Sequence, residues 1–163
     1  MPFVSRSKGA GSARQEVSGV LGRAIEQCRK GNWEQGLPYL GLLADSADRS
    51  SLPGLFYSYL GYGIALREQR LEEGLKLCRH AIKIEFFQPE NYLNLARTLL
   101  LTNDRRGAWK AVREGLKVDP HSEELLALQK DLGLRRPPVL SFLGRKHFLN
   151  RFLGSVRHRL TGG

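Results

Sequence analysis

Two amphipathic helical segments with a short turn between them recur along this chain at a spacing near 34 residues. The clearest copy is PENYLNLARTLLLTNDRRGAWKAVREGLKVDPHS, residues 89–122. Its apolar side chains recur at helical spacing on both sides of the polar break TNDRR, and the dipeptide DP ends the second run. Pro89 suits the first position of a helix, where its missing N–H costs nothing. Such a repeat restricts the fold strongly, because one helix pair cannot bury its apolar face alone and must stack on neighbours.

A second copy precedes this one in LFYSYLGYGIALREQRLEEGLKLCRHAIKIE, residues 55–85. The small residue of the first helix moves from Gly61 to Ala96, and that of the second helix moves from Gly74 to Ala108. Small residues let two helices cross closely while a large neighbouring side chain fills the space. We therefore predict that the small residues at these places are packing positions: Gly36, Gly61, Gly74, Ala81, Ala96 and Ala108.

A weaker first copy begins near Ala24 and continues in GNWEQGLPYLGLL. The pattern as a whole predicts an all-α fold, a right-handed solenoid of antiparallel helix pairs with about three repeats plus C-terminal helices. We expect a flexible N-terminal segment over residues 1–16, the solenoid with its capping helix over 17–133, and a basic amphipathic tail over 134–163. The cap is HSEELLALQKDLG, which ends at Gly133 before RRPP stops the helix.

At these residues the chain resembles the tetratricopeptide repeat (TPR) family, over roughly residues 17–122. The resemblance implies a concave groove, lined by the first helix of each pair, that binds a peptide or an amphipathic helix of another protein. Some members clamp a terminal carboxylate with Lys and Asn, but the matching positions here hold Leu21, Ile25 and Tyr62. The resemblance implies these groove positions: Leu21, Ile25, Ser58, Tyr62, Leu93, Arg97 and Leu101.

The net charge of +10 is concentrated at the two ends of the chain. Residues 17–133 carry 16 basic and 15 acidic side chains, whereas residues 134–163 carry seven basic side chains and no acidic one. Unmatched charge of this kind favours contact with an anionic partner, although a merely solvated terminus is the competing explanation.

The tail contains FLGRKHFLNRFLGSVRHRL, residues 142–160, whose apolar residues fall on one arc if it is helical. Four interpretations stay open: an extra cap on the chain's own solenoid, a helix bound by a protein partner, an anionic membrane surface, and nucleic acid. The basic residues expected to make contact are Arg145, Lys146, Arg151, Arg157 and Arg159.

Catalytic and metal-binding motifs are not visible in this sequence. Its four histidines stand apart from any metal-ligand spacing, and no Gly-rich phosphate loop follows a strand. Cys28 and Cys78 are expected to be buried and reduced. No secretory signal or run of about 20 apolar residues is present, which predicts a cytoplasmic protein.

These observations predict a non-catalytic scaffold or adaptor that binds another protein through its groove, its tail or both. The alternative is a peripheral tether to an anionic membrane surface or nucleic acid through the basic tail. We expect no cofactor, no metal and no small-molecule substrate.

Overall fold

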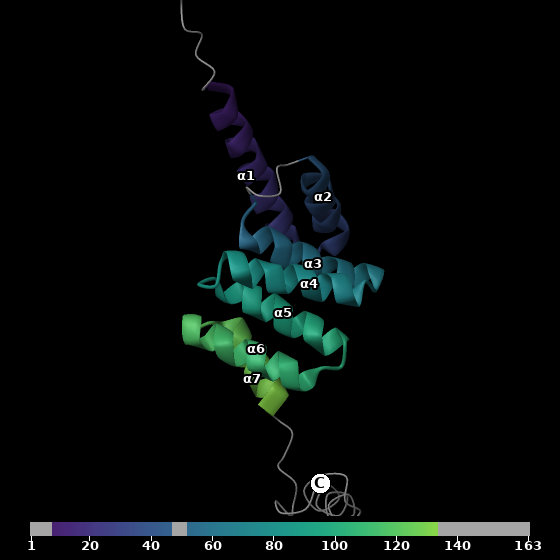
Figure 1. Ribbon diagram of the computed structural model, residues 1–163, viewed down its shortest axis with the longest axis vertical. Helices are drawn as coiled ribbons and strands as arrows, with labels where there is room; N and C mark the ends of the chain where they lie inside the picture. Colours follow the sequence, from purple (N-terminus) through teal and green to yellow (C-terminus); the bar gives the residue numbers. More distant parts are fainter. Residues whose placement is uncertain (1–7, 47–51, 134–163) are drawn as a thin grey trace, which may run out of the picture. The chain divides into compact units, whose positions relative to one another are not determined.

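The computed structural model describes residues 8–46 and 52–133 (Figure 1), which form α-helices and no strands. The helices within these ranges are α1 Lys8–Arg29, α2 Trp33–Ser46, α3 Gly54–Glu68, α4 Leu71–Ile84, α5 Pro89–Leu101, α6 Arg105–Val118 and α7 Glu123–Gly133. The prediction of an all-α fold is therefore confirmed.

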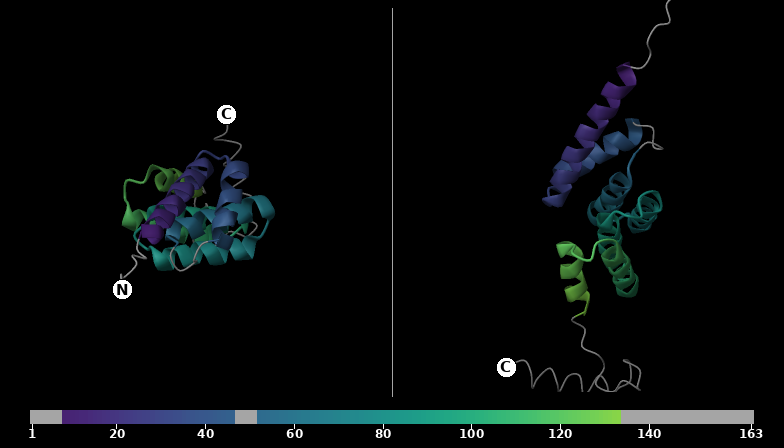
Figure 2. Two further views of the ribbon diagram at one scale, coloured as in Figure 1. Left: turned by 90° about the horizontal axis from the view of Figure 1, so that it is seen from above. Right: turned by 90° about the vertical axis from the view of Figure 1, so that its left-hand side faces the viewer.

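The first six helices form three antiparallel pairs, α1 with α2, α3 with α4, and α5 with α6. Each pair also contacts the next, because α2 packs on α3 and α4 packs on α5. The first helices lie beside one another as well, since α3 contacts both α1 and α5 (Figures 1 and 2). Stacking of this kind buries the apolar faces that a single pair would leave in water.

The turns inside the three pairs use the same backbone device. Gly31, Gln69 and Asn103 all have positive φ, at 82°, 59° and 60° respectively. Each of them stands two residues before the helix that follows it. In the third turn Asp104 then caps α6, because its side chain accepts a hydrogen bond from the Gly107 amide at 2.8 Å. A left-handed residue at one fixed place thus reverses the chain in every pair.

Helices α1 and α7 lie at the two ends of the described residues. Helix α1 begins at Lys8 and so extends into the segment 1–16, where good helix formers such as Ala10 and Ala13 favour propagation of an existing helix. Helix α7 begins after Ser122, and its Leu125 is fully buried against the Gly115 backbone of α6.

Glycine makes the closest helix crossing possible, that of α3 and α4. A Cβ on Gly61 would lie 2.7 Å from the carbonyl oxygen of Gly74, and a Cβ on Gly74 would lie 2.5 Å from the carbonyl oxygen of Gly61. Gly36 of α2 meets the Ala24 carbonyl of α1 in the same manner, at 2.7 Å. All six small residues predicted as packing positions are buried.

Both cysteines are buried and unpaired, as the sequence predicted. Burial withdraws their thiolate forms from water and raises the pKa of Cys28 and of Cys78 from 9.0 to about 11. A thiol with so high a pKa is a poor nucleophile at neutral pH, so both residues serve the core.

The Gly61 crossing gives a first prediction. Gly61→Leu should lower the free energy of unfolding by about 1–3 kcal/mol, because the added side chain forces α3 away from α4. Gly22→Leu is the matched control, since it lies on exposed α1 surface with nothing within 4 Å of an added Cβ. Chemical denaturation checks both variants, and equal stabilities would contradict the close crossing.

The buried thiols give a second prediction, on pH. Between pH 9 and about 11 the unfolded chain loses its thiol protons while the folded chain keeps them, so stability should fall as pH rises through this window. The double variant Cys28→Ala, Cys78→Ala should show a shallower decline than the wild type in urea denaturation at pH 8, 9, 10 and 11. Parallel pH profiles would refute the assignment.

Candidate functional site

The first helices α1, α3 and α5 present the surface that the sequence predicted as a groove. The structure buries four of the predicted residues, which are Leu21, Ile25, Ser58 and Leu93. In this structure their side chains form part of the core, and a role in partner binding stays a prediction from the sequence. Tyr62, Arg97 and Leu101 are partly exposed and stay candidates for contact.

Ser58 has a structural role that its sequence position concealed. Its hydroxyl accepts a hydrogen bond from the Asn94 side-chain amide at 2.9 Å, which ties α3 to α5. Cys78 of α4 completes the cluster, with its sulfur 3.6 Å from the Ser58 carbonyl oxygen and 3.5 Å from the Thr98 hydroxyl. All four side chains are buried, and these hydrogen bonds satisfy the Asn94 amide donor and the two hydroxyls. The Asn94 side-chain oxygen is buried without a hydrogen-bond partner among the described residues.

An aromatic and cationic surface forms where α2, α3 and α5 meet. The Arg97 guanidinium lies 5.8 Å from the centroid of the Tyr62 ring, within cation–π distance. Trp33, at the start of α2, meets the Tyr62 ring edge-on with 5.1 Å between centroids. Burial raises the pKa of Tyr62, and the nearby charge of Arg97 opposes that shift. The Tyr62 ring thus contacts two side chains, the Arg97 guanidinium and the Trp33 ring.

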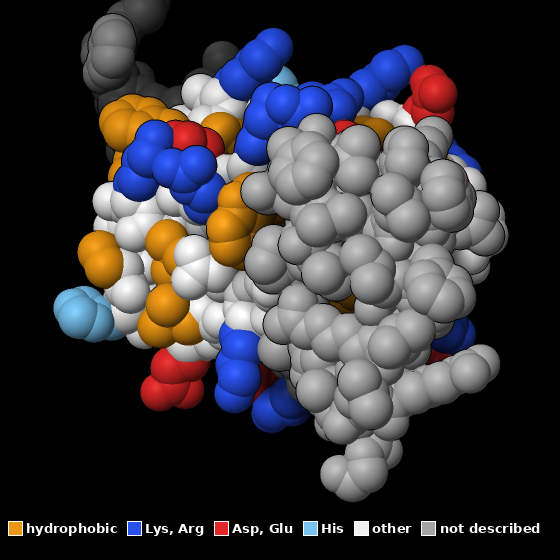
Figure 3. Space-filling view, turned by 90° about the horizontal axis from the view of Figure 1, so that it is seen from below, with side chains coloured by type: hydrophobic (Ala, Val, Ile, Leu, Met, Phe, Trp, Pro, Cys, Tyr) orange, Lys and Arg blue, Asp and Glu red, His pale blue; other side chains and the backbone are white. Residues whose placement is uncertain are grey.

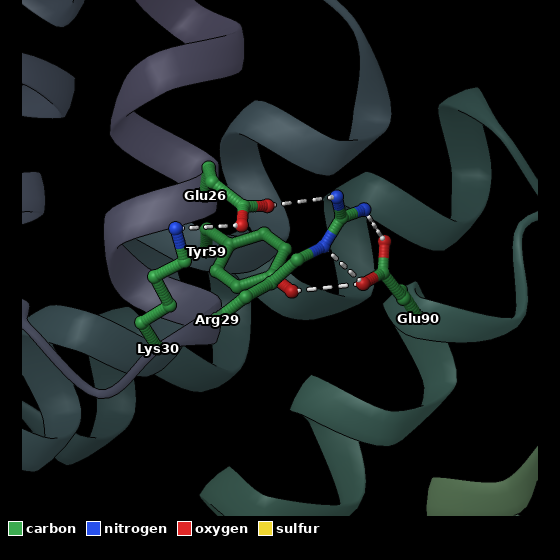
Figure 4. Close-up of polar contacts among 5 residues, drawn as sticks. All are labelled: Glu26, Arg29, Lys30, Tyr59 and Glu90. Atoms are coloured by element: carbon green, nitrogen blue, oxygen red, sulfur yellow. Dashed lines mark hydrogen bonds and ion pairs between the residues drawn. The ribbon is translucent and has the colours of Figure 1, made fainter.

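A polar cluster joins the first and third helix pairs across α3 (Figure 4). Arg29, the last residue of α1, donates two hydrogen bonds to the Glu90 carboxylate of α5, at 2.8 and 2.6 Å. The Tyr59 hydroxyl of α3 donates a third to the same carboxylate at 2.9 Å. Glu26 and Lys30 extend the cluster along α1 with ion pairs of 3.9 and 3.2 Å. We call Arg29, Tyr59 and Glu90 the clasp.

The clasp changes the acidity of its members. Hydrogen bonding to Glu90 raises the pKa of Arg29 above its ordinary value, so this guanidinium stays charged. Burial raises the pKa of Tyr59, and the negative charge of Glu90 raises it further. Tyr59 therefore remains a neutral hydrogen-bond donor at physiological pH. We did not predict Arg29 and Glu90, because they are 61 residues apart and no sequence period links them.

The described residues meet neither the requirement for a metal site nor that for a membrane-spanning helix. Within residues 8–46 and 52–133, no group of three or more His, Cys, Asp or Glu side chains could hold a metal ion. In the same ranges, no helix is long and apolar enough to cross a membrane. On the described part of the face in Figure 3, Lys and Arg side chains lie beside apolar ones, and Asp and Glu cover a smaller area.

The predicted basic tail, with Arg145, Lys146, Arg151, Arg157 and Arg159, lies outside the described residues. Its part in binding stays a prediction from the sequence.

Comparison with solved structures identifies the fold. The TPR domain of Arabidopsis OM64 matches with a TM-score of 0.57 and 11% identity, covering 75% of this chain and 98% of that one. The first TPR of Spaghetti (RPAP3) bound to the HSP90 peptide SRMEEVD matches with a TM-score of 0.58 and 12% identity, covering 73% and 94%. The second TPR domain of human RPAP3 in complex with the HSP70 peptide SGPTIEEVD matches with a TM-score of 0.57 and 13% identity, covering 75% and 98%.

The chain therefore has a TPR-like helical fold. No protein-family model matches its sequence, and no curated protein does so either. At identities this low, the comparison shows similarity of fold alone. The function is therefore inferred from the residues of the site.

The clasp gives a third prediction. A double-mutant cycle with Arg29→Ala and Glu90→Ala should show a coupling energy of about 0.5–1 kcal/mol, a value discounted for solvent screening because Arg29 is 45% exposed. The Glu34–Arg67 pair is the matched control, since its N–O distance is 2.7 Å but the Glu34 side chain is 83% exposed. Its coupling should be smaller. Equal couplings from urea denaturation would mean that the clasp adds nothing to an ordinary surface pair.

Proposed function

We propose that this protein is a non-catalytic interaction scaffold that binds a peptide or helix of another protein through the face of its first helices. Tyr62, Arg97 and Leu101 supply the contact surface. The observation that carries this proposal is the partly exposed Tyr62–Arg97 pair, whose Tyr62 ring is contacted edge-on by Trp33. Tyrosine and arginine are the residue types that most often dominate binding energy in protein interfaces.

Two of the similar structures support a peptide ligand, because their TPR domains hold the peptides SRMEEVD and SGPTIEEVD. Both peptides contain two Glu and one Asp. Here the face already contains a carboxylate of its own, Glu90, which takes three hydrogen bonds from Arg29 and Tyr59. We infer a less acidic ligand, with an apolar residue against Tyr62 and Leu101 and a single acceptor for Arg97.

We also propose that the protein acts in the cytoplasm. Its two buried cysteines are unpaired, which fits a reducing compartment.

Peptide display against the full chain tests the proposal. Peptides selected on the wild type should lose about tenfold or more in affinity for Arg97→Ala and for Tyr62→Ala, because each variant removes half of the pair. Lys110→Ala is the control, since this exposed cation of α6 belongs to a second helix. Calorimetric titration measures the affinities. If the three variants bind alike, the first-helix face is not the binding surface.

A further inference from the structure

A cleft of about 670 Å³ lies between α2, α3 and α4, and the proposed function does not use it. Its walls are mainly apolar and come from all three helices: Leu37, Pro38, Phe56, Leu60, Ile64 and Leu77. Trp33 lies at its edge and links it to the Tyr62 contact. A cavity of this size is in the range of binding sites, and its apolar lining favours an apolar occupant.

The cleft is long rather than compact. Its lining runs along α2 from Trp33 to Asp45, which is about 18 Å at 1.5 Å per residue. Opposite α2, its lining runs along α3 from Phe56 to Arg67, and Arg67 pairs with Glu34 at the start of α2. The cleft is as long as about three helical turns. An amphipathic helix could therefore lie along it with its apolar side chains facing the cleft.

The rim of the cleft is acidic. Four carboxylates and two guanidiniums line it: Glu34, Asp45, Glu68, Glu73, Arg67 and Arg70. Arg67 pairs with Glu34 at 2.7 Å, and Arg70 pairs with Glu68 and Glu73 at 2.8 and 2.6 Å. Asp45 forms no ion pair with any described residue. Among the described residues, its carboxylate therefore has no cation paired with it at that end of the cleft.

Comparison of the repeats shows that this surface of α2 is unlike its counterparts. The second helices align through residues that are buried in all three pairs, as Leu40, Cys78 and Val112 show. With this alignment, three outward positions hold Lys or Arg in α4 and α6 but not in α2. They are Lys76, Arg79 and Lys83 in α4, Lys110, Arg113 and Lys117 in α6, and Pro38, Gly41 and Asp45 in α2.

The stability of α2 does not explain these substitutions. Lys83 and Lys117 stand in the last turns of their helices, where a cation interacts favourably with the helix dipole. Asp45 occupies the equivalent position in α2, where its negative charge interacts unfavourably with the negative end of the helix dipole. Gly41 costs helix propensity, and nothing lies within 4 Å of an added Cβ that would require glycine there. Pro38, Gly41 and Asp45, which stand where the other second helices have Lys or Arg, open the cleft and leave no positive charge at these positions.

We propose that this cleft is a second interaction site, which binds an amphipathic helix of a protein partner that carries Lys or Arg beside its apolar stripe. The apolar walls take the stripe, while Asp45 and the carbonyl end of α2 attract a cation. The cleft shares Trp33 with the Tyr62 contact, but its other lining residues do not include Tyr62, Arg97 or Leu101, so variants at Asp45 and Gly41 test it separately.

The test uses the full chain with Trp109→Phe, which leaves Trp33 at the cleft as the only tryptophan. The probe is a synthetic amphipathic peptide of Leu and Lys, about 18 residues long so that it covers the trough. A peptide with Glu at every Lys position is its charge-reversed partner. We expect a saturable shift of the Trp33 emission with the Leu/Lys peptide and weaker binding of the Leu/Glu peptide.

Two pairs of variants locate the binding. Asp45→Lys introduces the residue type of the other repeats. It should lower the affinity for the Leu/Lys peptide by about tenfold or more without lowering the melting temperature of the protein. Glu114→Lys on α6 makes the same change in charge away from the cleft. Gly41→Leu fills the cleft where space is open and should also weaken binding, whereas Gly22→Leu on α1 should not.

Three results would overturn the proposal. The first is binding of the Leu/Glu peptide as tight as that of the Leu/Lys peptide, which would mean that the cleft does not select a cationic partner. The second is an equal effect of Asp45→Lys and Glu114→Lys, or of Gly41→Leu and Gly22→Leu. The third is the absence of any emission shift with either peptide.

Discussion

The rest of the structure depends on the contact between two glycines, Gly61 of α3 and Gly74 of α4. Their backbones approach so closely that each occupies the place of the other's missing side chain. This approach brings Cys78 to within hydrogen-bonding reach of Ser58 and lets Asn94 of the next pair join the same cluster. Because the second pair contacts both of its neighbours, its internal spacing sets how the first and third pairs can pack.

The sequence predicted the fold well, because repetition supplies the same information three times. Apolar periodicity located the helix pairs, and the spacing of Gly61 and Ala96 identified the packing positions. It predicted the site less well for a physical reason. A residue on a first helix can face the partner or the neighbouring helix, and periodicity alone does not separate these directions when both faces are apolar. Leu21, Ile25 and Leu93 have the residue types expected of either surface, and their burial decides for the core.

The polar parts of the site could not be predicted from local pattern. The three members of the clasp come from three different helices, and their meeting depends on how successive pairs rotate against one another. The cleft beside α2 is associated with a difference in sequence, since α2 has Pro38, Gly41 and Asp45 where the later copies have Lys or Arg. That departure becomes informative once buried residues fix the alignment of the three second helices.

The clasp has a consequence for cooperativity. In a stack of repeats, stability is close to a sum of terms for single units and for adjacent units, so the ends can fray independently of the middle. Arg29 and Glu90 instead belong to units that are not adjacent, and Tyr59 of the intervening unit contacts the same carboxylate. Melting of the first unit therefore removes a neighbour from the third as well as from the second. Such a next-nearest-neighbour bond favours loss of structure in a single step over stepwise fraying.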